Sequence, residues 1–221
     1  MRSTVSSAAE ELRFTHVHVP PTDRAETRTL LLLHGTGGTE RDLLQLGATI
    51  APGARLLGVR GQVLEGGLPR FFRRLAEGVF DEADVVRRAA DLAAFLPVAA
   101  LAYGFDPARV VALGFSNGAN IAVALLLLHP GVLAGAVLLR SMVPLEPSTL
   151  PALPGTPVLL AQGAQDPIVP RANADRLASL LRDAGAAVTL HWEQAGHGLT
   201  QSDVSVAQEW MASWSDGTAS G

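Results

Sequence analysis

Short runs of consecutive apolar residues alternate along the chain with longer stretches in which apolar residues recur at helical spacing. Continuous apolar runs are typical of buried strands, and the helical spacing predicts helices that turn one face to a core. The stretch 14–20 alternates apolar and polar residues instead, which predicts an edge strand. Further strands are expected at 29–35, 54–61, 109–113, 135–141, 157–163 and 187–194, and helices at 39–50, 81–104, 121–128, 171–185 and 202–214.

The order of these elements predicts the fold class. Apolar strands that alternate with helices form a mainly parallel sheet with helices on both faces. We therefore expect one α/β domain over 1–221, without internal repeats or an interdomain linker. The two ends, about 1–10 and 215–221, are expected to be disordered. The proline-rich stretch 142–157 predicts a surface loop between two strands.

Local signals mark the ends of two helices. Thr39, with Asp42 three residues later, is a variant of the capping box and predicts the start of the helix at 39–50. The helix at 81–104 begins with acidic residues, which favour a helix N-terminus. Pro97 is expected to kink this long helix, because proline removes a hydrogen bond from the helix interior.

Composition narrows the possible chemistry. The chain has 221 residues, is 48% hydrophobic and contains no cysteine. Disulfides, a thiolate nucleophile and cysteine-ligated metals are therefore excluded, and the composition fits a reducing compartment. All 17 basic residues are arginine, so a lysine Schiff base is excluded as well.

Charge and hydropathy give expectations about partners and location. The formal net charge of −4 argues against a nucleic-acid partner. The first 14 residues lack the apolar region of a signal peptide, and no apolar run reaches about 18 residues, the length of a membrane span. We therefore expect a cytoplasmic protein.

The sequence GFSNG at 114–118 joins an apolar strand directly to an apolar helix. A sharp bend of this kind pushes the hydroxyl of the central serine out of the sheet and aims the helix N-terminus at the group that the serine attacks. Glycines at 114 and 118 are expected because side chains there would collide with the neighbouring strand and helix. Ser116 is therefore the predicted nucleophile.

A serine nucleophile needs a base, and the base needs an orienting acid. In chains with this type of bend, the acid and then the histidine follow the serine. Asp166 follows the strand at 157–163, and His197 follows the strand at 187–194. Both residues are therefore expected at the same sheet edge as Ser116, with His197 as the base and Asp166 as its partner.

The predicted reaction also needs backbone N–H groups for a developing negative charge. Asn117, directly after the nucleophile, is expected to supply one. The loop after the strand at 29–35 is expected to supply the second through Thr36, with His34 supporting that loop by hydrogen bonding. A dinucleotide site does not fit this loop, because its glycine pattern would require a small residue where Glu40 stands.

Other polar residues compete with these assignments. Asp175 and Glu193 are alternative acids, and Asp166, which precedes a proline, is also a typical turn former. His16 and His18 share one face of the first strand, but no third ligand accompanies them. We therefore predict no metal site.

The segment 68–80 follows a strand and is expected over the same sheet edge. Phe71 and Phe72 are either walls of an aromatic or acyl pocket or ordinary core residues, and the pattern does not separate the two. The arginines at 70, 73 and 74 are expected to be solvated, with attraction of an acidic substrate group as the alternative. Met142 and Ile168 are further pocket candidates from their positions alone.

Four segments together resemble the α/β-hydrolase superfamily, specifically its small carboxylesterase/phospholipase branch: LLHGTGG (32–38), GFSNGAN (114–120), GAQDPIVP (163–170) and GHGLT (196–200). The segment 59–81 is similar to hydrolases associated with hydroquinone or catechol stress. The resemblance extends from about 29 to 210. Phe115 and Asn117 stand where many relatives have His or Tyr and Gln, which bears on substrate shape, since only the backbone N–H of Asn117 is needed.

The resemblance implies a cofactor-independent carboxylesterase that cleaves short or medium soluble esters. Relatives with a lid insert a helical cap between the strands at 135–141 and 157–163; here that stretch is too short, so no cap domain and an open site are expected. A thioesterase, lactonase or lysophospholipase would use the same residues. A catalytically silent binding protein on this fold is the alternative from another class. The resemblance also suggests a homodimer.

Overall fold

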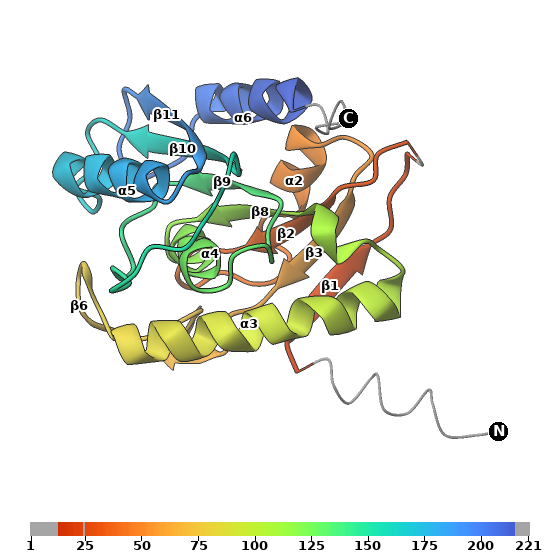
Figure 1. Ribbon diagram of the computed structural model, residues 1–221, viewed down its shortest axis with the longest axis horizontal. Coiled ribbons are helices and arrows are strands. Elements are labelled where there is room, and N and C mark those ends of the chain that lie inside the picture. The colour runs from red at the N-terminus through yellow and green to blue at the C-terminus, as the bar shows by residue number, and fades with distance from the viewer. Residues whose placement is uncertain (1–12, 24, 215–221) are drawn as a thin grey trace.

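The computed structural model describes residues 13–23 and 25–214, and the ends expected to be disordered, about 1–10 and 215–221, lie outside these ranges. Its centre is a seven-stranded sheet in the order β1-β3-β2-β8-β9-β10-β11 (Figure 1). Only β1 runs antiparallel to its neighbour in this sheet. The strands are β1 (His16–Val19), β2 (Thr29–Leu33), β3 (Arg55–Val59), β8 (Val110–Phe115), β9 (Gly135–Leu139), β10 (Pro157–Gly163) and β11 (Ala187–Glu193).

Helices cover both faces of the sheet, which confirms the predicted fold class. One face carries α3 (Glu82–Tyr103), α4 (Asn117–Leu128) and α5 (Arg171–Asp183), and the other carries α2 (Leu44–Ile50) and α6 (Gln201–Ser213) (Figure 1). In β2, Leu31 and Leu33 pack under the first group of helices, and Leu30 and Leu32 under the second. Because both faces are covered, every residue of β2 is buried, which explains its unbroken apolar pattern.

The order of the strands creates a crevice at one edge of the sheet. From β2, the chain first adds β3 on one side and then returns to add β8 on the other. The loops that leave the carboxyl ends of β2 and β8 therefore diverge. Ligands of open parallel sheets bind at such a reversal of strand order.

The helix predicted at 39–50 begins later in the structure. The structure has turns over 40–43, and α2 starts only at Leu44. The Thr39 hydroxyl donates to the Asp42 carboxylate at 2.6 Å, but no residue caps the helix with its side chain. The buried Glu40 lies in these turns, and its carboxylate pairs with Arg60, just beyond β3, so a tertiary contact holds this part of the chain before the helix begins.

Two small hairpins occupy the segment between β3 and α3, where no strands were predicted. They pair β4 (Val63–Glu65) with β5 (Leu68–Arg70) and β6 (Arg74–Ala76) with β7 (Val79–Phe80). Their strands are only two or three residues long and partly exposed, so they lack the apolar periodicity of the main sheet. The turn between β4 and β5 is Gly66-Gly67, both at positive φ, which is a typical hairpin signal.

The remaining connections lie around α3 and between β9 and β10. A 3-10 turn, η1 (Pro107–Arg109), precedes β8, and α3 is a single helix with Pro97 inside it, capped by Asp81 and ended by Gly104 in the left-handed conformation. Residues 140–156, between β9 and β10, form no helix or strand. The described residues therefore form no cap domain over the carboxyl edge of the sheet.

Candidate active site

Ser116 occupies a strained bend between β8 and α4. Its φ is 52°, a left-handed value that is uncommon for a residue with a side chain. A Cβ at Gly118 would overlap the backbone of Leu33, and a Cβ at Gly114 would lie 2.6 Å from the backbone of Ala119. The two glycines therefore let the helix start tightly against β2, as the sequence pattern predicted.

The structure brings Ser116, His197 and Asp166 into one hydrogen-bonded row. His197 Nε2 lies 2.9 Å from Ser116 Oγ, and His197 Nδ1 lies 2.8 Å from Asp166 Oδ2. A carboxylate can only accept, so Nδ1 carries the proton and Nε2 is left to accept from the serine hydroxyl. This is the arrangement in which a histidine can remove the serine proton.

The carboxylate of Asp166 is fixed from two sides. Its other oxygen, Oδ1, accepts from the backbone N–H groups of Ile168 (2.8 Å) and Val169 (3.1 Å). The Asp166 side chain is completely buried, whereas the His197 side chain is about one-fifth exposed. Asp166 therefore forms the turn and faces the histidine at the same time. The competing acids lie elsewhere: Asp175 is on α5, and Glu193 faces His191.

Two backbone N–H groups lie near the serine, those of Thr36 and Asn117. Neither Thr36 nor Asn117 donates a backbone hydrogen bond to another residue in the described part of the chain. Both residues line the same cavity as Ser116. They are therefore available to a negatively charged oxygen of a bound reactant.

His34 supports the loop that carries Thr36. The backbone N–H of Gly61 donates to His34 Nε2 at 3.0 Å, so Nδ1 carries the proton and donates to the Gly35 carbonyl at 2.6 Å. Burial lowers the pKa of His34 below its usual value, although the hydrogen bond to Gly35 acts in the opposite direction. His34 is therefore a neutral structural residue at pH 7, in the role expected from the sequence.

The β4–β5 hairpin and the residue directly after it contact both Thr36 and Asn117, the residues that carry these two N–H groups. Arg70 Nη1 donates to the Thr36 hydroxyl at 2.5 Å, and the backbone N–H of Gly37 donates to the Pro69 carbonyl at 2.8 Å. Directly after the hairpin, the backbone N–H of Phe71 donates to Asn117 Oδ1 at 2.7 Å. The sequence did not indicate these contacts, because they depend on a hairpin without apolar periodicity.

A cavity of about 300 Å³ opens at Ser116. Met142 and Ile168 line it, and so do three apolar residues not singled out from the sequence as pocket walls, Phe80, Phe115 and Val169. Its polar lining consists of Thr36, Arg70, Arg74, Glu77, Ser116, Asn117, Asn120, Arg140 and His197.

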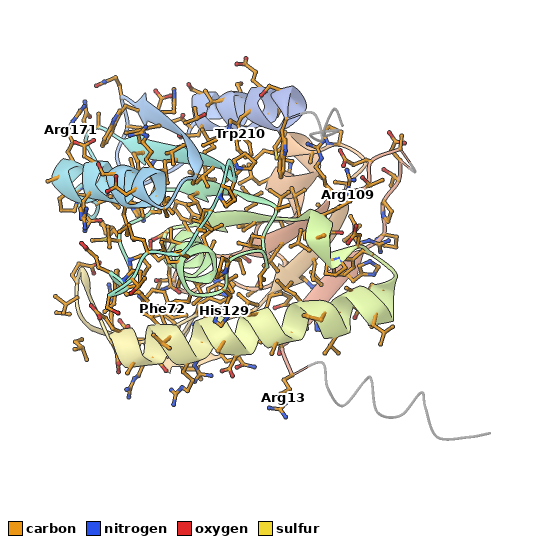
Figure 2. All side chains as sticks on the ribbon, viewed as in Figure 1. Arg13, Phe72, Arg109, His129, Arg171 and Trp210 are labelled. Atoms are coloured by element: carbon orange, nitrogen blue, oxygen red, sulfur yellow. The ribbon has the colours of Figure 1, made fainter. Side chains whose placement is uncertain are left out.

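The structure decides between the two readings of Phe71 and Phe72 and places Arg70 elsewhere than expected. Phe71 and Phe72 are core residues rather than cavity walls, and Phe72 packs beside the first turns of α3 (Figure 2). Arg70 is buried rather than solvated, with Glu65 at 3.4 Å as its counter-ion. The hairpins explain the difference, because they fold the segment inward. Of the arginines at 70, 73 and 74, only Arg73 remains largely in solvent.

The two histidines of β1 contact one tyrosine. His16 Nε2 lies 2.5 Å from the Tyr103 hydroxyl, and His18 stacks on the same ring. No cluster of three or more potential metal ligands occurs among the described residues. Within the same residues, no helix combines the length and the apolar character that a membrane crossing requires.

The fold and the bend at Ser116 together define the class of protein. A mainly parallel sheet with helices on both faces, and a strand–serine–helix bend at its carboxyl edge, is the architecture of the α/β hydrolases.

Comparisons with known proteins identify the family within this class. The phospholipase/carboxylesterase family matches residues 73–215. The Bacillus subtilis (strain 168) protein "Putative hydrolase MhqD" is 51% identical over 181 residues, which are 82% of this chain and 90% of that protein. The chain belongs to the phospholipase/carboxylesterase family and is an ester hydrolase.

Solved structures agree with this assignment. The crystal structure of the Bacillus cereus carboxylesterase superposes with a TM-score of 0.90 at 46% identity, over 95% of this chain and 99% of that chain. A carboxylesterase from Mesorhizobium loti gives a TM-score of 0.84 at 32% identity, over 91% of this chain and 95% of that one.

Proposed function

We propose that the chain hydrolyses carboxylic esters in two steps through an acyl-enzyme on Ser116. In the first step, His197 Nε2 takes the Ser116 proton while Oγ attacks the ester carbonyl carbon. The tetrahedral intermediate then collapses, and His197 gives this proton to the departing alcohol. In the second step, water attacks the acyl carbon, His197 takes its proton and returns it to Ser116 Oγ, and the carboxylic acid leaves.

The other site residues assist without exchanging atoms with the substrate. The backbone N–H groups of Thr36 and Asn117 bind the oxygen that becomes negative in each tetrahedral intermediate. Loss of one such donor typically costs on the order of 3 kcal/mol in the barrier. Asp166 keeps His197 in the tautomer with the proton on Nδ1 and stabilises the imidazolium that forms.

One observation carries this proposal: the continuous row from Ser116 Oγ to His197 at 2.9 Å and from His197 to Asp166 at 2.8 Å. The three residues come from loops after β8, β11 and β10, so the row depends on the sheet order and not on sequence proximity. The identities of the relatives as hydrolases and carboxylesterases support the same chemistry.

The substrates that fit the site best are short or medium soluble esters. The cavity volume of about 300 Å³ lies at the lower end for small-molecule pockets. Phe80, Phe115 and Met142 give it an apolar wall beside the serine. Without a cap domain, the rest of a long acyl chain would remain in water, so long-chain lipids gain little from this site.

The first experiment is labelling with a fluorophosphonate probe, followed by intact-mass measurement. We expect one adduct on the wild-type protein, none on Ser116→Ala and slow labelling of His197→Ala. Ser205→Ala, which removes an exposed hydroxyl on α6, is the matched control and should label like the wild type. Absence of an adduct on the wild-type protein at neutral pH would favour a binding protein without catalytic activity.

The second experiment measures kcat/KM for p-nitrophenyl esters of increasing acyl length. We expect the highest values for acetate to hexanoate and a decline for longer chains. The same series of thioesters and lactones tests the alternative acyl donors. A maximum at dodecanoate or beyond would contradict the proposed substrate size while leaving the serine mechanism in place.

A further inference from the structure

Arg140 is a completely buried arginine directly after β9, at the carboxyl edge of the sheet. Its φ is 55°, and it shares a left-handed backbone with only Ser116 among the described residues other than glycine. A left-handed backbone is strained at a residue with a side chain, and such residues concentrate at functional sites. The sequence analysis assigned no role to this residue.

The guanidinium of Arg140 uses all five of its N–H groups. Nε donates to the Gly196 carbonyl at 3.1 Å, and Nη2 donates to the Gly198 carbonyl at 3.0 Å. Nη1 donates to the Ala161 carbonyl at 3.1 Å. The two remaining N–H groups form a fork on the Asp203 carboxylate, at 2.8 and 2.6 Å.

The two carbonyls at Gly196 and Gly198 flank His197 on either side. We infer that Arg140 is the positioning residue for His197, because it fixes the peptide groups before and after the histidine and so sets where the imidazole meets Ser116. Arg140 also lines the cavity, but it has no N–H group left for a substrate. It therefore acts through the histidine. This inference rests on the proposed role of His197 as the base.

Asp203 anchors the arginine to the helix that follows the histidine loop. Burial acts to raise the pKa of Asp203, but the hydrogen bonds from Arg140 and Thr200 and the positive charge of Arg140 outweigh it and lower the pKa. The same carboxylate accepts from the backbone N–H of Thr200 at 2.8 Å and completes the capping box of α6. The Arg140–Asp203 pair thus joins the N-terminal end of α6 to the carboxyl end of β9, across the loop that carries His197.

The chemistry of arginine suits this task better than that of lysine. A planar guanidinium presents donors in fixed directions that reach a carboxylate and three separate carbonyls at once. An ammonium is instead a compact charge at the end of a flexible side chain. Glycines on both sides of His197 give the loop little stiffness of its own. Without the arginine, the position of the imidazole relative to Ser116 would be poorly defined.

Arg140→Lys tests the inference, because it keeps the charge next to Asp203 and removes the fork. We expect kcat for p-nitrophenyl acetate to fall at least about tenfold with KM changed less than about twofold, since a displacement of about 1 Å can cost 100-fold in rate. The matched control is Arg28→Lys, the same change at the half-buried Glu26–Arg28 ion pair before β2, at the opposite edge of the sheet. This control should retain kcat.

A double-mutant cycle separates positioning from general damage to the fold. In a His197→Ala background, Arg140→Lys should leave the residual rate of fluorophosphonate labelling at Ser116 unchanged, since there is no imidazole left to position. An equal loss in both backgrounds would overturn the inference. If His197→Ala itself labels as fast as the wild type, the proposed function fails instead, so the two failures are distinguishable.

Asp203→Asn provides a second test if Arg140→Lys does not fold. It preserves the shape of the side chain and one acceptor oxygen but removes the charge that holds the guanidinium. We expect kcat to fall several-fold in the wild-type background and the labelling rate to stay constant in the His197→Ala background. An unchanged kcat in a folded Asp203→Asn protein would contradict the role of Arg140.

Discussion

The backbone N–H of Phe71 donates to the side-chain oxygen of Asn117 at 2.7 Å, although 46 residues separate the two in the chain. This bond ties the segment after the β4–β5 hairpin to the first turn of α4. Arg70, the residue before Phe71, binds the hydroxyl of Thr36. The spacing between the backbone N–H groups of Thr36 and Asn117 therefore depends on one short hairpin.

Asn117→Ala should lower both stability and activity. The buried N–H of Phe71 would lose its acceptor, which costs about 1–3 kcal/mol of unfolding free energy. We expect kcat to fall by about tenfold or more, because the backbone donor at 117 loses its link to the hairpin. Urea denaturation and steady-state kinetics measure the two effects.

Asn173→Ala is the matched control for Asn117→Ala. Its side-chain oxygen accepts from the backbone N–H of Val143 at 2.9 Å, so the same kind of loop contact is lost away from the serine. This variant should lose stability and retain kcat. A similar loss of kcat in both variants would mean that the Phe71–Asn117 bond has no special effect on the reaction.

Thr36→Val should lower kcat while leaving the backbone donor of residue 36 in place. Valine has the shape of threonine but offers no oxygen to Arg70 Nη1. We expect a decrease in kcat of about tenfold, the effect of about 1.4 kcal/mol on the barrier, and a nearly constant KM. Thr49→Val on α2, which removes an exposed hydroxyl bonded to the Gln45 carbonyl, is the control. Equal rates for wild type and Thr36→Val would show that Arg70 does not act through this hydroxyl.

Gly163→Ala should displace the histidine loop. A Cβ at this last residue of β10 would overlap the carbonyl of Gly196 and lie 2.6 Å from the carbonyl of Ala195. We expect kcat to fall by about 100-fold, since a shift of about 1 Å at the base is costly. Gly47→Ala, which crowds the Leu32 side chain under α2 at 3.0 Å, is the control for crowding alone and should keep its rate.

The stability of the protein should fall in mild acid partly because of His34. Burial lowers the pKa of His34 in the folded state, so between that value and the unfolded pKa of about 6.5 the unfolded chain binds more protons. The free energy of unfolding therefore decreases as the pH falls below about 6.5. A proton on Nε2 would also face the N–H of Gly61.

Urea titrations of the wild type and His34→Gln from pH 8 to pH 5 measure this effect. We expect a shallower pH dependence in the variant, together with a lower stability at pH 8 from the lost Gly61 contact, about 1–3 kcal/mol. The pH dependence that remains in the variant includes a contribution from His18, because burial and the charge of Arg55 also lower the pKa of His18. Parallel curves for the two proteins would contradict a buried neutral His34.

The sequence predicted the main sheet and the order of its helices because long apolar periodicities encode burial. The helix 81–104 agrees with α3 within one residue at each end, since Asp81 and Gly104 are local capping signals. The helix at 39–50 was predicted too long, because the ion pair of the buried Glu40 with Arg60 is a tertiary contact that no local pattern reports.

The predicted site residues came from chain order and from their places after strands. Ser116, Asp166 and His197 each follow a strand whose carboxyl end points to one edge, so an α/β topology is enough to expect them together. The pocket walls were harder to predict. Met142 and Ile168 line the cavity, while Phe71 and Phe72 do not, because two hairpins of short exposed strands turn them into the core.

The fold class, the bend at Ser116 and the order of acid and histidine could be predicted from the amino-acid sequence, because they depend on local patterns and on which residues follow which strands. The contacts of Arg70 and Arg140 could be seen in the folded chain alone. Each binds backbone or side-chain atoms far away in the chain, and an arginine in the sequence looks the same whether it is solvated or buried. Burial with complete hydrogen bonding is a property of the assembled fold.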